Sequence, residues 1–310
     1  MMIGGGRNLA GRLALIVTCF VWVARAQEGI DFDKVGVQTV QIADGIYVLV
    51  GGHPAVGNIG VSVGTDGILV VDSMYAPLHQ KILDALAKIS RGPIRFVINT
   101  HNHVDHTGGN ELMSKMGAVI IGHENLRKRM VSQQANPDQQ NTPASTAALP
   151  ILTYRDSLTL HFNGEEIYVY HPDAAHTDGD SVVYFRRANV MHVGDLPSSL
   201  RYPNIGVDDG GSVNGMIAGV EQILKIANPD TKIIPGHIGT AVSVTELQQQ
   251  RDMFMVVRDR VLRQIRMGKT LEQVIASKPT AEFDESRRKG VITPDRFAEL
   301  VYRDLSSRNP

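Results

Sequence analysis

One run, THNHVDHTGGN at residues 100–110, places three histidines and an aspartate within six positions. His101 and His103 are two residues apart, so in an extended chain both side chains leave on the same side and can hold one ion. Asp105 and His106 follow at the turn into a helix, where they can face a second ion. The two glycines behind them let the backbone pass close to bound metal without a Cβ clash. This run therefore predicts a metal site at the end of a strand.

Three further candidate ligands follow apolar, β-branched runs. His176 lies in AAHTDGD, Asp195 ends VMHVGD and His237 ends TKIIPGH. Because all three follow predicted strands, we expect one edge of the fold to gather them with the histidine run. Five histidines and two aspartates suit two zinc ions, since imidazole and carboxylate groups are favourable zinc ligands and a carboxylate can bridge.

The order of predicted elements indicates an α/β fold. Alternating runs separated by Gly, Asp and Asn predict four strands joined as hairpins over residues 38–73. Helices are predicted over 77–90, 110–117 and 213–227, and further strands over 94–100, 118–122, 157–162, 166–171, 181–186, 190–195 and 231–237. Two halves, each rich first in strands and then in helices, predict two β layers packed face to face with helices outside.

Two other segments complete this reading. Residues 131–150 are polar and dotted with proline, so we predict a long surface loop there. From Val244 onward the chain is predicted to be helical and charged, with its longest helix over 246–267.

The first 26 residues have the pattern of a secretory signal peptide. Arg7 and Arg12 precede the apolar run LALIVTCFVWVA, and ARA offers a cleavage site after Ala26. The alternative, an uncleaved membrane anchor, fits less well because the run is short for a bilayer. We therefore expect an exported protein, periplasmic or secreted, whose mature single domain spans residues 27–310 without stable membrane insertion.

Composition excludes some chemistry. The formal net charge of the 310-residue chain is −1, and no basic excess suggests nucleic acid as a partner. The only cysteine, Cys19, lies in the predicted signal peptide. The mature chain therefore has no thiolate to serve as nucleophile or ligand. A small-molecule substrate is expected, and the oligomeric state is left open.

Taken together, THNHVDHTGG, AAHTDGD, the aspartate of VGD and the histidine of PGH resemble the ordered motifs of the metallo-β-lactamase superfamily. The resemblance covers nearly all of the mature chain. It implies a four-layer αββα sandwich, here with a C-terminal helical extension at about residues 244–310. ILVVDS also looks like that family, which puts an aspartate at Asp72 to buttress the metal loop.

The resemblance also implies a role for each ligand. His101, His103 and His176 would bind the first zinc, Asp105, His106 and His237 the second, and Asp195 would bridge the two. The set is most similar to the glyoxalase II and lactonase branches, because many class B β-lactamases have a cysteine, serine or other residue in place of Asp195.

The leading hypothesis is a zinc-dependent hydrolase. A hydroxide bridging two metal ions, with its pKa lowered toward about 7, would attack the carbonyl of an ester, lactone, thioester or β-lactam. Asp105 would be the catalytic residue, binding metal and orienting the nucleophile. Three alternatives stay open: a class B β-lactamase proper, an iron-dependent enzyme similar to sulfur dioxygenases, and a non-catalytic metal-binding protein.

Loops 51–58, 131–150 and 197–212 are expected to select the substrate. Within them, His53 is a candidate to overhang the site, Tyr202 to donate a hydrogen bond to an oxyanion, and Arg201 to bind a substrate carboxylate. The alternatives are a solvated loop histidine for His53 and an ordinary packing residue for Tyr202. Three other residues are predicted to be structural, His192 in its strand and the two aspartates of the His176 loop, Asp178 and Asp180.

Overall fold

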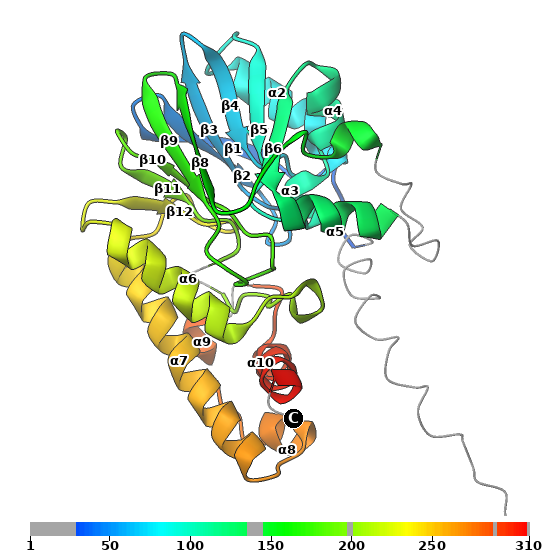
Figure 1. Ribbon diagram of the computed structural model, residues 1–310, viewed down its shortest axis with the longest axis vertical. Helices are drawn as coiled ribbons and strands as arrows, with labels where there is room; N and C mark the ends of the chain where they lie inside the picture. The colour runs from blue at the N-terminus through cyan, green and yellow to red at the C-terminus, as the bar shows by residue number, and fades with distance from the viewer. Residues whose placement is uncertain (1–28, 135–144, 197–200, 288–289, 309–310) are drawn as a thin grey trace, which may run out of the picture. The chain divides into compact units, whose positions relative to one another are not determined.

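Figure 1 shows the computed structural model, which describes residues 29–134, 145–196, 201–287 and 290–308. The predicted signal peptide and its cleavage site lie outside these residues. Every helix and strand described below lies in the unit that begins at Gly36. None of the described helices is both long and apolar enough to cross a membrane.

The first sheet has seven strands, which neighbour one another in chain order. They are β1 (Val37–Ala43), β2 (Ile46–Gly51), β3 (Ile59–Gly64), β4 (Gly67–Val71), β5 (Ile94–Ile98), β6 (Val119–His123) and β7 (Leu152–Tyr154). β1 to β4 pair antiparallel, which confirms the predicted hairpins, whereas β4 to β7 pair parallel. All five residues of β4 are buried, as expected of a parallel strand that is covered on both faces.

The second sheet has five strands in the order β12-β11-β10-β9-β8. They are β8 (Ser157–Phe162), β9 (Glu165–Tyr170), β10 (Val182–Phe185), β11 (Val190–His192) and β12 (Lys232–Ile234). β8 and β9 are joined by Asn163 and Gly164, whose φ angles of 55° and 74° fit the tight hairpin turn that this pair of residues predicts.

Alternation along the second sheet separates two apolar cores. Val183 and Ile234 belong to the core between the two sheets. Their neighbours Val182 and Ile233 belong to a different core, which the second sheet shares with helices. Because successive side chains of a strand leave on opposite faces, one sheet serves both cores.

Helices cover the outer face of each sheet (Figure 1). On the first sheet, α2 (His79–Ala87) contacts β1, α4 (Asn110–Lys115) contacts β5 and β6, and α5 (Glu124–Gln134) contacts β6 and β7. On the second sheet lie α6 (Val213–Ile226) and α7 (Val244–Arg266), which share its apolar core. This is the predicted αββα sandwich.

The C-terminal helices form the predicted extension. α8 (Leu271–Ala276), α9 (Asp284–Arg287) and α10 (Pro294–Arg308) follow α7, and α10 contacts α6, α7 and α8. Phe297, Val301 and Leu305 of α10 are buried in the core that the helices share with the second sheet. The extension is therefore packed onto the sandwich through a common core.

The structure corrects the prediction of a long loop over residues 131–150. α5 continues to Gln134, and Thr146–Ala148 form a short 3-10 helix that Ser145 caps. Of the predicted loop, residues 135–144 lie outside the described part of the chain. The apolar pattern of α5 is weak because its buried stripe rests on two residues four positions apart, Leu126 and Met130.

Candidate metal centre

All seven predicted ligands meet at one edge of the sandwich, each near the C-terminal end of a strand. His101 and His103 follow β5, and Asp105 and His106 lie in the short helix α3 (Val104–Thr107). The others follow strands of both sheets: His176 lies between β9 and β10, Asp195 follows β11 and His237 follows β12. The parallel strands β5, β11 and β12 bring their carboxyl ends to this edge.

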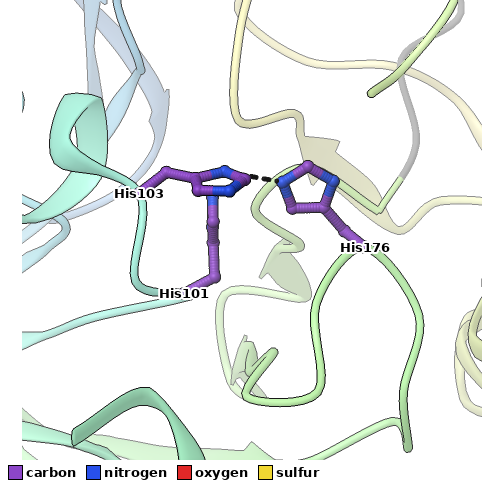
Figure 2. Close-up of side chains that lie close together, drawn as sticks. All are labelled: His101, His103 and His176. Atoms are coloured by element: carbon purple, nitrogen blue, oxygen red, sulfur yellow. Dashed lines mark hydrogen bonds between the residues drawn. The ribbon is translucent and has the colours of Figure 1, made fainter. Parts of the chain in front are cut away.

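Three histidines form the first group of ligands. Figure 2 shows the rings of His101, His103 and His176 converging from two separate loops. His103 Nδ1 and His176 Nε2 lie 3.0 Å apart. The ring centroids of His101 lie 4.8 Å and 4.6 Å from those of His103 and His176.

The outward nitrogens of this group are already used. His176 Nδ1 lies 2.9 Å from the backbone oxygen of Asn204, and His103 Nε2 lies 3.2 Å from Asp209 Oδ2. Carbonyl and carboxylate oxygens only accept hydrogen bonds, so each ring must carry its proton on the outward nitrogen. When both rings are neutral, the inward nitrogens, His103 Nδ1 and His176 Nε2, face each other as lone pairs, and a cation between them would take the place of a shared proton.

Asp72 orients two more rings from behind. Its carboxylate accepts hydrogen bonds from the backbone and hydroxyl of Thr100, both at 2.7 Å, and contacts His106 Nδ1 at 2.7 Å. The Thr100 hydroxyl lies 3.0 Å from His101 Nδ1. Because that hydroxyl donates to Asp72, it accepts from His101, and His101 Nε2 is left free to bind a metal.

A second group consists of Asp105, His106 and His237. His237 Nε2 lies 3.0 Å from Asp105 Oδ2 and 3.1 Å from His106 Nε2. His237 Nδ1 is held by the backbone oxygen of Pro54 at 3.1 Å, so its Nε2 also faces inward as a lone pair.

Asp195 lies between the two groups. Its carboxylate is 3.4 Å from His106 Nε2, 3.3 Å from His237 Nε2 and 3.8 Å from His176 Nε2. With His101 and His106 it also forms a third cluster of atoms spaced for a metal. This position, in reach of both groups, is the one that a bridging carboxylate needs.

Two independent observations indicate that this donor set suits two cations. His101 Nε2 and Asp195 Oδ1 are buried, and neither has a hydrogen-bond partner among the described residues. Unpaired buried polar atoms are costly unless a ligand satisfies them. In addition, inward lone pairs and two carboxylates crowd together in a small buried volume, which positive charge would neutralise.

The pKa shifts reflect the same crowding. Burial lowers the pKa of His176 to about 4, and burial with the neighbouring imidazoles holds the pKa of His101 well below its ordinary value. Burial alone would also lower the pKa of His106, but the carboxylates of Asp105, Asp72 and Asp195 raise it well above 6.5. A metal ion competes with protons for such a set of ligands.

Two glycines make room for this arrangement. A Cβ on Gly57 would lie 2.7 Å from the backbone oxygen of Asp105 and 2.9 Å from the His106 ring. A Cβ on Gly236 would lie 2.1 Å from Asp195 Oδ1. By contrast, Gly108 and Gly109 pack against the backbone that follows β4, so their close approach is to that loop and not to the ligands.

The structure also shows the contacts of the candidate residues in the loops that are expected to select the substrate. Tyr202 is buried, donates to Asp284 Oδ1 at 2.7 Å and stacks on Phe297. It is therefore a packing residue, and its hydroxyl is used inside the protein. Arg201 is also buried, and its guanidinium lies 3.2 Å from Asp195 Oδ2, so it supports a ligand.

The remaining residues have structural contacts. His53 accepts a hydrogen bond from the backbone of Ala55, and His192 is fully buried and accepts one from the backbone of Gly194. Asp180 accepts hydrogen bonds from the backbone nitrogens of His176 and Thr177, which confirms that it fixes the His176 loop.

Sequence reasoning missed the residues that hold the histidines from outside. Asp209, Asn204 and Pro54 lie 106, 28 and 183 positions from the histidines they contact. Two of the three act through backbone oxygens, which no residue type reveals. Asp209 carries a carboxylate, but it stands in no motif that would single it out.

Comparisons with known proteins agree with this geometry. A family model described as the metallo-beta-lactamase superfamily matches residues 53–237. A metallo-beta-lactamase type 2 of Bacillus sp. (strain 170) is 23% identical over 185 residues, which cover 59% of this chain and 67% of that protein. A linear primary-alkylsulfatase of Pseudomonas sp. (strain ATCC 19151) is 24% identical over 252 residues, which cover 68% of this chain and 47% of the alkylsulfatase. The chain thus spans about half the length of that relative.

Solved structures show the same fold. A metallo-beta-lactamase from Pontibacter korlensis superposes with a TM-score of 0.58 at 16% identity. The superposition covers 71% of this chain and 99% of the Pontibacter chain. The inverting sec-alkylsulfatase Pisa1 from Pseudomonas sp. superposes with a TM-score of 0.67 at 18% identity, covering 87% of this chain and 50% of its own.

Proposed function

This chain belongs to the metallo-beta-lactamase superfamily, and on that premise we propose that it is a metal-dependent hydrolase of small molecules. The observation that carries the proposal is the pair of ligand groups with Asp195 between them. A fold alone does not set a function, whereas these groups provide a specific set of metal donors. We propose zinc as the metal, two ions per chain, since the donors are imidazole nitrogens and carboxylate oxygens.

When bound, two such cations supply Lewis acidity and lower the pKa of water toward about 7. His101, His103 and His176 would hold one cation, and Asp105, His106 and His237 the other. Their outward hydrogen bonds fix each ring before any ligand arrives, so little reorganisation is needed during the reaction.

Asp105 is the proposed catalytic residue. Its side chain is 16% exposed and that of His103 is 15% exposed, whereas His106, His176 and His237 are at most 4% exposed. A substrate therefore reaches the centre from the side of Asp105 and His103. There the Asp105 carboxylate would bind metal and orient the attacking nucleophile.

The preferred substrates are carbonyl compounds: esters, lactones, thioesters or β-lactams. The ligand set favours the glyoxalase II and lactonase branches, because many class B β-lactamases have a cysteine, serine or other residue in place of Asp195. β-Lactams stay within the proposal because relatives of this chain are metallo-beta-lactamases. Arg201 is not available to a substrate carboxylate in the described structure, since it is buried against Asp195.

A second candidate is hydrolysis of an alkyl sulfate ester. The likeness to alkylsulfatases extends over more of the chain than that to the β-lactamases, 87% against 71% for the two structures above. The test is one panel of a lactone, a thioester, a β-lactam and a medium-chain alkyl sulfate, assayed with the zinc-loaded chain.

Carbonyl turnover that is lost with a chelator and restored by zinc would support the first candidate. Turnover of the alkyl sulfate alone would replace it with the second. Metal-loaded protein that hydrolyses none of these compounds would contradict both. Export, predicted from residues 1–26, remains a proposal to be tested by sequencing the N-terminus of secreted or periplasmic protein.

A further inference from the structure

We propose that Arg129, on the outer helix α5, is a positioning residue for the three-histidine end of the metal centre. The inference rests on the metal centre proposed above. Arg129 does not touch a ligand ring. It binds two acidic residues, Asp178 and Asp209, which belong to the two loops that position His176 and His103.

The first contact of Arg129 is bidentate. Its Nε lies 2.9 Å from Asp178 Oδ1, and its Nη2 lies 2.7 Å from Asp178 Oδ2. Asp178 is two residues after His176 in the loop between β9 and β10. Paired, charge-assisted hydrogen bonds of this kind fix geometry as well as adding energy.

The second contact reaches the support of His103. Arg129 Nη1 donates to the backbone oxygen of Asp208 at 3.1 Å and lies 3.5 Å from Asp209 Oδ1. The other oxygen of that carboxylate, Asp209 Oδ2, lies 3.2 Å from His103 Nε2. Arg129 thus holds one side of the carboxylate whose other side orients the ring.

The two loops are also joined to each other. The backbone nitrogen of Asp178 donates to the oxygen of Asp209, and that of Gly206 donates to the oxygen of His176. Gly210 closes the junction: a Cβ there would lie 2.9 Å from Asp178 Cβ and 3.0 Å from Arg129 Nη2. A movement of Arg129 would therefore be transmitted to both His103 and His176.

Charge explains why a cation is needed at this junction. The carboxylates of Asp178 and Asp209 are both partly buried and converge on the same guanidinium. Without it they would repel each other, and Asp209 would be drawn away from the position that orients His103. Lysine would restore the charge but not the planar fork that grips Asp178.

The experiment measures zinc affinity by competition with a chromophoric chelator, for the wild-type chain and five variants. Arg129→Met is expected to weaken one of the two zinc-binding events about 10- to 100-fold and leave the other unchanged. His176→Ala, which removes a ligand, identifies the affected event as that of the three-histidine end. Arg129→Lys is expected to recover part of the loss.

Asp209→Asn gives the same test if Arg129→Met does not fold, because it keeps the shape of the side chain. The matched control is Arg303→Met. Arg303 lies on α10 and pairs with the Asp208 side chain at 2.9 Å, next to the same junction. The control is expected to bind both zinc ions as the wild type does.

Cobalt substitution gives a second readout. The visible absorption of Co²⁺ at the three-histidine end is expected to change in Arg129→Met and Asp209→Asn and to be unchanged in Arg303→Met. Wild-type zinc affinity in Arg129→Met, or an equal loss in Arg303→Met, would overturn the inference while leaving the proposed function intact. A wild-type chain that binds no zinc would overturn the proposed function itself.

Discussion

At the scale of single residues, the two ring nitrogens of each histidine in the centre have different roles. One nitrogen is held by a protein oxygen, from Thr100, Asp209, Asn204, Asp72 or Pro54, and the other faces the centre. Such outer partners set the tautomer and the ring orientation of metal ligands. Residues that act on the substrate are therefore distinct from residues that orient the ligands.

Asp105→Asn tests the first kind. The neutral amide binds metal and orients the nucleophile less well than the carboxylate, so we expect turnover to fall by about 10²-fold or more. Steady-state rates on the best substrate of the panel measure it, with metal content determined on the same samples. The control is Asp208→Asn, an aspartate whose side chain is half exposed and pairs with Arg303. Loss of metal with an unchanged rate per bound metal would contradict the catalytic role.

Asp72→Asn tests the second kind. Asp72 has a φ of 69°, a conformation that asparagine tolerates, so the backbone should be undisturbed. The amide cannot accept all three hydrogen bonds from Thr100 and His106, so we expect zinc affinity to fall about 10- to 100-fold. Chelator competition measures this change, and unaltered affinity for both ions would refute the role given to Asp72.

The candidate ligands themselves could be identified from the sequence because each stands in a short run after an apolar strand. His101, His176 and His237 are examples, and the structure brings them to one edge. Their supports could not be identified, since contacts such as Pro54 to His237 depend on chain segments 183 residues apart. Arg201 shows a related limit: its residue type fits substrate binding, and only its burial against Asp195 assigns it elsewhere.

At the scale of elements, the strands carry the ligands and the helices cover the strands. Alternating or continuous apolar, β-branched runs predicted eleven of the twelve strands in the described residues in type and approximate place, and the exception, β7, has only three residues. α5 was not predicted because only two of its apolar residues form a buried stripe. It begins directly after β6, at whose end lies a second pair of histidines outside the metal centre.

His123, the last residue of β6, predicts a pH dependence of stability. It is buried, its Nε2 donates to the backbone oxygen of Arg155 at 2.8 Å, and its Nδ1 accepts from the backbone of Asn125. Burial, with charge repulsion from the neighbouring His171 imidazole, lowers the pKa of His123 to about 4. Both nitrogens are therefore paired only in the neutral ring.

The unfolded chain binds this proton near pH 6.5 and the folded chain only near pH 4, so the free energy of unfolding falls as pH drops through that window. The pKa difference corresponds to about 3 kcal/mol by pH 4. Urea unfolding at pH 7 and pH 4.5 measures this loss, which His123→Gln should reduce. The control His161→Gln replaces an exposed histidine on β8. Equal pH dependence in wild type and His123→Gln would contradict the assignment.

At the scale of the whole described unit, the C-terminal helices and the sandwich share one core. Phe297 of α10 stacks on Tyr202 at a centroid distance of 4.9 Å, and Tyr202 follows Arg201, which contacts Asp195. The extension is thus linked through two residues to the carboxylate between the ligand groups. A helical C-terminus could be predicted from its charge and spacing, but this link could not, because it joins Tyr202 to residues about 80 to 95 positions away.

Phe297→Ala tests this shared core. The side chain is fully buried, so its truncation is expected to lower the free energy of unfolding by about 3–5 kcal/mol. Because the sheet and the helices share apolar contacts, unfolding should remain a single transition by both circular dichroism and tyrosine fluorescence. Two separate transitions, with only the first shifted by the substitution, would show instead that the extension is an independent unit.

The most direct test of the central claim is the metal content of the chain, purified without added metal and measured by elemental mass spectrometry. We predict about two zinc ions per chain, held by the seven candidate ligands that the structure brings together. About one iron per chain would contradict the zinc hydrolase and favour the oxidoreductase alternative. No metal, with none taken up when zinc is added, would contradict the metal centre altogether.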